Sequence, residues 1–167
     1  QLHNRRTEIL IVSSGAVAIG STYLRKKRSH MNLNEMQAAA AMGQAQLVME
    51  WQDSFKSSGI NTAQILLTRS DTENKKRFLN SKDTLLTLIK YDVIPIINEN
   101  DTFATEELRY GDNDRLAARV AQMTSADLLI LLSDVDGMYT SNPKTNLTAK
   151  HIPVIDNLNE EIFSMAD

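Results

Sequence analysis

Residues 93–101 read Val-Ile-Pro-Ile-Ile-Asn-Glu-Asn-Asp, an apolar run that ends in four polar side chains. From Val93 to Ile97 the residues do not alternate between apolar and polar, which is typical of a strand buried on both faces. Strands of this kind occur mainly in parallel sheets that helices cover on both sides. The stretch therefore indicates an α/β fold with a polar cluster, residues 98–101, at the carboxyl end of a strand.

Three further segments share this apolar character, and helical patterns lie between them. We predict these strands over residues 8–13, 62–68 and 127–132. We predict helices over residues 16–27, over about 34–57, after Asp71, and from the Gly-Asp-Asn-Asp run at 111–114. After Thr140 the chain turns polar before a short strand at 152–155 and a last helix near 158–165. No repeat or linker divides the chain, so we expect a single domain.

The helix patterns also predict which side chains are buried. In the helix over 34–57, Asn34 and Gln37 have the spacing of a capping signal. Apolar residues recur there at spacings of three and four, and we interpret them as core: Met36, Ala40, Gly43, Leu47, Trp51 and Phe55. The buried residues predicted for the two following helices are Phe78, Leu79, Leu85, Leu86, Ile89, Leu116, Val120 and Met123.

The composition excludes several classes of protein. Hydrophobic residues make up 42% of the 167 residues and charged residues 23%, as in an ordinary globular domain. A net charge of −3 with 5% aromatic residues predicts no nucleic-acid partner. The absence of cysteine excludes disulfides and thiolate metal sites. No apolar run approaches a membrane span and no signal peptide opens the chain, so we expect a cytoplasmic protein with no membrane partner.

Polar residues end each predicted strand, where open α/β sheets bind their ligands. The four segments are residues 13–15, 68–69, 98–101 and 133–134, and in a parallel sheet they share one edge. Ser14 and Gly15 also precede a helix, whose unpaired N–H groups favour an anion. The alternative is that Ser14 only caps this helix.

Several acidic residues would gather near the same edge: Asp101, Asp112, Asp114 and Asp134. Such a cluster needs a cation, which a substrate ammonium, a lysine or Mg²⁺ bridging nucleotide phosphates would supply. Alternatively, Asp112 and Asp114 are first-turn acids that complement a helix dipole, and spacing leaves both interpretations open.

Other features favour ordinary structural roles. The basic run at 25–28 is interpreted as a solvated helix end. The three histidines lie far apart without helical pairing, so we expect no protein-bound metal site. Neither a Walker loop nor a GxGxxG motif is present, so a bound nucleotide would use a different cradle.

Two groups of motifs resemble a known family. Residues 133–143 (SDVDGMYTSNP) resemble the nucleotide-site segment of the amino acid kinase superfamily, which includes aspartokinases and bacterial uridylate kinases. The order and spacing of four further motifs resemble the glutamate 5-kinase family, which also forms the N-terminal part of pyrroline-5-carboxylate synthase. These motifs are residues 12–18 (VSSGAVA), 64–68 (QILLT), 96–101 (IINEND) and 111–118 (GDNDRLAA). The resemblance covers essentially the whole chain.

The resemblance implies a three-layer α/β/α sandwich with a mostly parallel central sheet. It also implies a transferase that phosphorylates the γ-carboxylate of L-glutamate with ATP and Mg²⁺, the first step of proline biosynthesis. By motif, the resemblance implies that Ser14, Asp101 and Asn113 bind glutamate, with Asn98 and Asp112 close by. It implies that Asp114 orients the catalytic lysines. It also implies that Ser133 and Asp134 contact ATP. The implied partners are a second copy of the chain, proline as a feedback inhibitor acting near residues 102–110, and glutamyl phosphate reductase in the pathway.

The chain departs from the family pattern at both ends. The family carries an N-terminal strand with a lysine-bearing Gly-rich loop, and a later GTGGM-like loop with a second lysine; neither is in these residues. The RNA-type C-terminal domain of many bacterial members is also missing. We therefore expect a partial amino acid kinase domain over residues 1–167, truncated at both ends and without the cationic half of the site. The alternatives are a sister kinase of the aspartokinase or uridylate kinase type, and a non-catalytic remnant that binds an amino acid or a nucleotide.

Overall fold

The computed structural model describes His3 and residues 7–102, 113–133 and 135–165. The chain divides into two compact units, residues 1–129 and residues 130–167. The expectation of one partial domain over residues 1–167 stays a prediction. Among the described residues, no helix combines the length and the apolar character needed to cross a bilayer.

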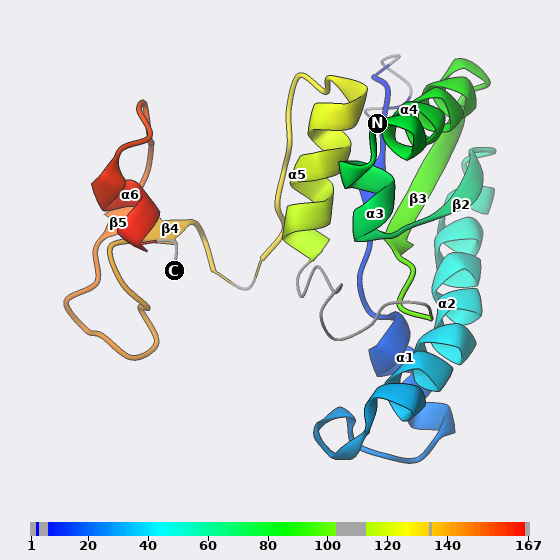
Figure 1. The fold of residues 1–167 in the computed structure, drawn as a ribbon, viewed down its shortest axis with the longest axis horizontal. Helices are drawn as coiled ribbons and strands as arrows, with labels where there is room; N and C mark the ends of the chain where they lie inside the picture. The colour runs from blue at the N-terminus through cyan, green and yellow to red at the C-terminus, as the bar shows by residue number, and fades with distance from the viewer. Residues whose placement is uncertain (1–2, 4–6, 103–112, 134, 166–167) are drawn as a thin grey trace. The chain divides into compact units, whose positions relative to one another are not determined.

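A three-stranded parallel sheet forms the centre of the first unit (Figure 1). Strand β3 (Val93–Glu99) lies between β1 (Ile11–Val12) and β2 (Asn61–Leu67). All three apolar runs were predicted as strands, although β1 pairs over fewer residues than the predicted 8–13. The parallel sheet of an α/β fold is thereby confirmed.

The register of the strands brings their carboxyl ends to one edge of the sheet. Val12 is paired with Ile97, and Leu67 with Glu99. Since all strands run in the same direction, the segments that follow them leave the sheet together. This edge is called the carboxyl edge below.

Helices cover both faces of the sheet (Figure 1). Helices α4 (Lys75–Lys90) and α5 (Asn113–Thr124) pack on one face, where the core consists of Leu67, Leu85, Ile97, Leu116, Val120 and Met123. Successive strand residues point to opposite faces. Asn98, next to Ile97, accordingly contacts helix α2 (Leu33–Lys56), which covers the other face, and α1 (Ala16–Tyr23) packs against α2. The layers match the three-layer α/β/α expectation.

The remaining elements are short. A 3₁₀ turn, η2 (Arg28–His30), joins α1 to α2, and α3 (Arg69–Glu73) precedes α4. In the second unit, β4 (Met138–Tyr139) pairs antiparallel with β5 (His151–Ile152), and α6 (Glu160–Met165) follows.

The capping signal predicted for α2 was wrong by two residues. Asn32, not Asn34, is the N-cap: its Oδ1 accepts from the Glu35 N–H at 2.9 Å, and the Asn32 N–H donates to Glu35 Oε2 at 2.9 Å. Lys26 lies 2.7 Å from the same carboxylate. Hydrogen bonds from the Lys26 ammonium and the Asn32 backbone lower the pKa of Glu35.

The single helix expected with Asp71 as its cap is two helices, and Asp71 caps neither of them. The N-cap of α3 is Thr68, and Asn74 caps α4 separately. Asp71 belongs to α3, where its carboxylate accepts from the Thr68 N–H at 2.7 Å and the Thr68 hydroxyl at 2.6 Å. Burial raises the pKa of Asp71, but these hydrogen bonds and the one from Arg77 outweigh burial, so the pKa lies below its ordinary value.

Two residues predicted in the core of this region are exposed. Leu79 is 48% exposed and Leu86 37%, whereas Leu85 is fully buried. One residue corresponds to a rotation of about 100° around a helix. Leu79 and Leu86 each follow an inward-facing residue, the partly buried Phe78 and the buried Leu85, and therefore lie toward solvent.

The predicted strand at 127–132 does not form among the described residues. Its apolar side chains are exposed, with Leu128 at 74%, Ile130 at 64% and Leu132 at 94%. A strand requires a neighbour that accepts and donates its ladder hydrogen bonds. High strand propensity alone, without such a neighbour, does not produce a strand here.

Candidate functional site

Three of the four predicted polar segments meet at the carboxyl edge. The Ser13 N–H donates to the Ile97 carbonyl at 2.9 Å, and the Asn100 N–H donates to the Leu67 carbonyl at 2.8 Å. The segments that follow β1, β2 and β3 therefore start beside one another, as the parallel sheet predicted.

Asn98 is the buried centre of this edge, with 2% of its surface exposed. Its Oδ1 accepts from Asn113 Nδ2 at 2.9 Å and from the Glu99 N–H at 2.8 Å. Its Nδ2 donates to Gln44 Oε1 at 2.7 Å. The structure thus joins Asn98 and Asn113, two predicted site residues from separate elements, at the start of α5.

Two side chains of α2 that the sequence did not assign to the carboxyl edge also reach it. Gln44 contacts Asn98, and Trp51 Nε1 donates to Ser13 Oγ at 2.9 Å. Trp51 was predicted only as core, and Gln44 was not singled out. A signal for Gln44 was present: it follows Ala40 by four residues and precedes Leu47 by three, so it is a polar residue inside the apolar stripe.

Ser14 lies exposed between β1 and α1. The N-cap of α1 is Gly15, at φ 115°, and no side chain of the described residues caps this helix. The alternative that Ser14 caps the helix is therefore wrong. The left-handed backbone at this turn favours glycine and lets the chain bend from strand to helix beside the carboxyl edge.

Helix α1 is held against α2 by glycine contacts. A Cβ at Gly20 would lie 1.8 Å from the Ala39 carbonyl oxygen. A Cβ at Gly43 would lie 1.8 Å from the Ala16 carbonyl oxygen. Neither position has room for a side chain, so the two backbones touch. This contact fixes the first turn of α1, and with it the Ser14 segment, on α2.

The acidic residues are placed only in part. Asp114 is exposed in the first turn of α5, a position that suits the helix dipole as well as a catalytic role. Asp101 is half-buried, two residues beyond β3. Asp112 and most of the loop at 102–110 lie outside the described residues. Within the described part of the chain, no three His, Asp or Glu side chains gather closely enough to hold a metal ion.

The nucleotide motif lies in the second unit. There the Tyr139 hydroxyl donates to Asp136 Oδ1 at 2.9 Å, and the His151 ring packs edge-on against Tyr139 at 5.2 Å between centroids. This hydrogen bond lowers the pKa of Asp136 and raises that of Tyr139. Ser133 precedes this turn, and Asp134 lies outside the described residues, so the ATP contacts stay predictions.

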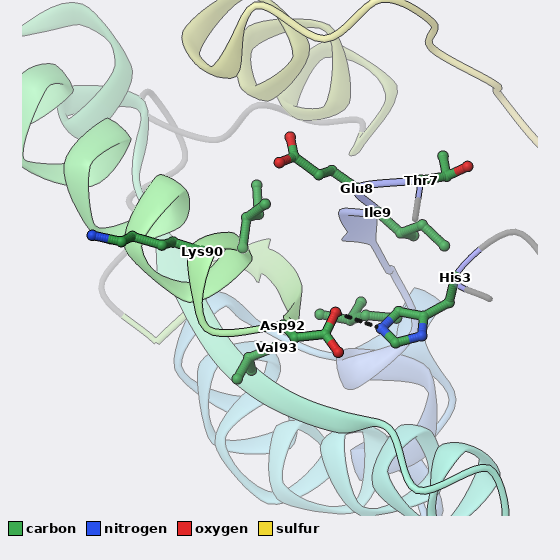
Figure 2. A pocket seen from close by; sticks show the side chains of 9 residues that line it. His3, Thr7, Glu8, Ile9, Lys90, Asp92 and Val93 are labelled. Atoms are coloured by element: carbon green, nitrogen blue, oxygen red, sulfur yellow. Dashed lines mark ion pairs between the residues drawn. The ribbon is translucent and has the colours of Figure 1, made fainter. Parts of the chain in front are cut away.

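A cavity of about 280 Å³ lies at the opposite end of the sheet (Figure 2). It is lined by His3, Thr7, Glu8, Ile9, Ile89, Lys90, Asp92, Val93 and Ile94. Figure 2 shows the His3 ring turned toward Asp92, with Nε2 at 3.0 Å from the carboxylate. At about 3.3 Å per strand residue, Val93 lies roughly 16 Å from Asn98, so this cavity is separate from the carboxyl edge.

Comparison with known proteins identifies the family. The model of the amino acid kinase family matches residues 1–162. The chain is 52% identical over 166 residues to the glutamate 5-kinase of Bartonella henselae and 54% identical over 160 residues to that of Caulobacter vibrioides. These alignments cover 99% and 96% of this chain but 44% and 42% of the relatives, so the chain spans less than half the length of the curated relatives it matches. The chain belongs to the amino acid kinase family.

Proposed function

We propose that the complete protein is a glutamate 5-kinase, which transfers the γ-phosphoryl group of ATP to the γ-carboxylate of L-glutamate as the first step of proline biosynthesis. The observation that carries the proposal is the hydrogen-bonded pair Asn98 and Asn113 at the carboxyl edge. Both residues lie in motifs that resemble the glutamate 5-kinase family. This chain is 52% identical, over nearly its whole length, to a protein named glutamate 5-kinase.

The side chains at this edge suit an amino acid substrate. The Asp101 carboxylate would neutralise the substrate ammonium, with Asp112 nearby. The Ser14 hydroxyl, the N–H groups at the start of α1 and the Asn113 amide would donate to a substrate carboxylate. The side-chain nitrogen and oxygen of Asn98 already form hydrogen bonds with Gln44 and Asn113. Asn98 would therefore hold Asn113 in place rather than bind glutamate itself.

Phosphoryl transfer needs mainly positioning and charge neutralisation, without a covalent intermediate on the protein. Asp114 would orient lysines that lie in loops outside these 167 residues, and Ser133 and Asp134 would contact ATP. Mg²⁺ is commonly held by one or two carboxylates together with nucleotide phosphates. Asp101 and Asp114 are the described carboxylates that could contribute to such a site, and the metal would neutralise the phosphates of ATP.

The remaining expectations from the family belong to the same proposal. They are a cytoplasmic location, a homo-oligomer, feedback inhibition by proline, and a glutamyl phosphate reductase that consumes the product. An acyl phosphate is reactive toward water, so a following enzyme that reduces it is chemically reasonable.

The test uses the purified full-length protein with Mg-ATP, L-glutamate and hydroxylamine, which traps an acyl phosphate as a coloured hydroxamate. We expect hydroxamate with L-glutamate, and none when glutamate or ATP is left out. L-Aspartate and UMP serve as matched acceptors, with ADP release as the common readout. Turnover with aspartate or UMP in place of glutamate would show a sister kinase. No turnover with any acceptor would show a non-catalytic protein.

A further inference from the structure

Gln44 occupies a position where packing alone favours an apolar residue. It is 8% exposed and lies within the buried stripe of α2, next to Gly43. Its Oε1 accepts from Asn98, but its Nε2 has no hydrogen-bond partner among the described residues. A buried amide N–H without a partner destabilises a fold. Gln44 therefore needs an explanation other than stability.

The direction of the hydrogen bonds fixes the orientation of this amide. Asn98 Oδ1 is used by two donors, Asn113 Nδ2 and the Glu99 N–H, so Asn98 can face Gln44 only with its Nδ2. Gln44 must then present Oε1. The three amides form a one-way relay in which Asn113 donates to Asn98 and Asn98 donates to Gln44.

The same turn of α2 also carries the contact with α1. Gly43, next to Gln44, lies against the Ala16 carbonyl. Two turns further on, Trp51 donates to Ser13. One rigid helix therefore contacts the segment that bears Ser14 and, through Asn98, the amide of Asn113.

We propose that Gln44 is a positioning residue for the amino acid substrate, acting through Asn98 to hold the Asn113 amide in its binding orientation. This inference rests on the proposed function of the carboxyl edge. Asn113 would contact the substrate equally before and during phosphoryl transfer. Loss of its orientation therefore raises KM for glutamate and leaves kcat nearly unchanged.

The test variant is Gln44→Met in the full-length protein. Methionine has a similar length, but its thioether sulfur is only a weak acceptor for Asn98 Nδ2. The substitution removes the unpaired Nε2 of Gln44 but leaves the Nδ2 of Asn98 without its acceptor. Because these two effects oppose each other, we expect little change in thermal stability. We expect KM for glutamate to rise about tenfold, with kcat and KM for ATP within about twofold of the parent. Gln46→Met is the matched control, because Gln46 donates to Glu50 on the surface of the same helix at 2.7 Å, and its KM should not change.

A double-mutant cycle shows whether Gln44 acts through Asn113. In the Asn113→Ala background, Gln44→Met should change KM for glutamate by less than about twofold, because no oriented amide remains to be lost. Independent, multiplying effects in the double variant would overturn the inference. So would a Gln44→Met protein that matches the control, or one whose stability, kcat and both KM values deteriorate together.

The two proposals fail in different ways. If the parent phosphorylates aspartate or UMP instead of glutamate, the proposed function fails, and the same variants tested with that acceptor decide the role of Gln44. A parent inactive toward all three acceptors overturns both. An active parent with an unaffected Gln44→Met variant overturns only the role of Gln44.

Discussion

Gly43→Ala is expected to destabilise the protein even though alanine is the better helix former. The added Cβ would lie 1.8 Å from the Ala16 carbonyl oxygen and 2.6 Å from the Gly20 nitrogen. Both are backbone atoms, so no side-chain rotation relieves the clash. Helix α1 would have to move about 1.2 Å from α2 merely to reach a 3.0 Å separation.

The two opposing effects have different magnitudes. Overpacking costs about 1–3 kcal/mol, and a clash with backbone lies at the upper end of this range. Replacing glycine by alanine inside a helix gains about 1 kcal/mol. We therefore expect a net loss of about 2 kcal/mol in the free energy of unfolding.

Urea unfolding of the full-length protein, followed by circular dichroism, measures this difference as a lower midpoint at an unchanged slope. The control is Ala45→Gly on the exposed side of α2, which should lose about 1 kcal/mol through helix propensity alone. A Gly43→Ala protein that is more stable than the parent by about 1 kcal/mol would refute the reasoning. It would mean that α1 and α2 do not touch at this position.

Three other perturbations have defined outcomes in the same unfolding assay. Asn32→Ala should lose about 1 kcal/mol because it removes the cap of α2, whereas Asn34→Ala should be neutral; equal effects would contradict the capping box. Leu85→Ala should lose about 2–5 kcal/mol by leaving a cavity, and the exposed Leu86→Ala less than about 1 kcal/mol; a reversed order would contradict the burial. The pKa of Asp71 is lowered in the fold, so its contribution is present above its unfolded pKa and is lost as the pH falls through the folded value. The stability difference between the parent and Asp71→Asn should therefore shrink from about pH 5 to pH 3, and a constant difference would show that the carboxylate charge has no role.

The sheet was predictable because its strands carry their own signal. Residues 93–97 are short, continuously apolar and followed by polar residues, and this pattern is nearly sufficient for a parallel strand covered on both faces. Residues 62–68 include the polar Gln64, and their strand is only partly buried. The shared edge followed from the parallel direction. The pairing of Asn98 with Asn113 agrees with that prediction, although their roles toward glutamate are still to be measured.

The errors arose where a local pattern needed distant information. Residues 127–132 have the composition of a strand, but a strand also needs a neighbour, and no window of sequence reveals whether one is present. The cap of α2 was predicted at the wrong residue because the sequence offers two equivalent capping patterns, Asn32 with Glu35 and Asn34 with Gln37. Gln44 was missed because an apolar stripe favours a core interpretation for every residue within it.

The apolar run at 128–132 has a practical consequence for handling the protein. Its five side chains are between 41% and 94% exposed, and its backbone pairs with no described strand. An exposed, uncharged segment with high strand propensity is a template for cross-β association between molecules. Expressed as an isolated fragment, residues 1–167 would be prone to aggregate at the concentrations that crystallisation requires. A charged substitution such as Ile130→Lys should improve its solubility, and light scattering would report the difference.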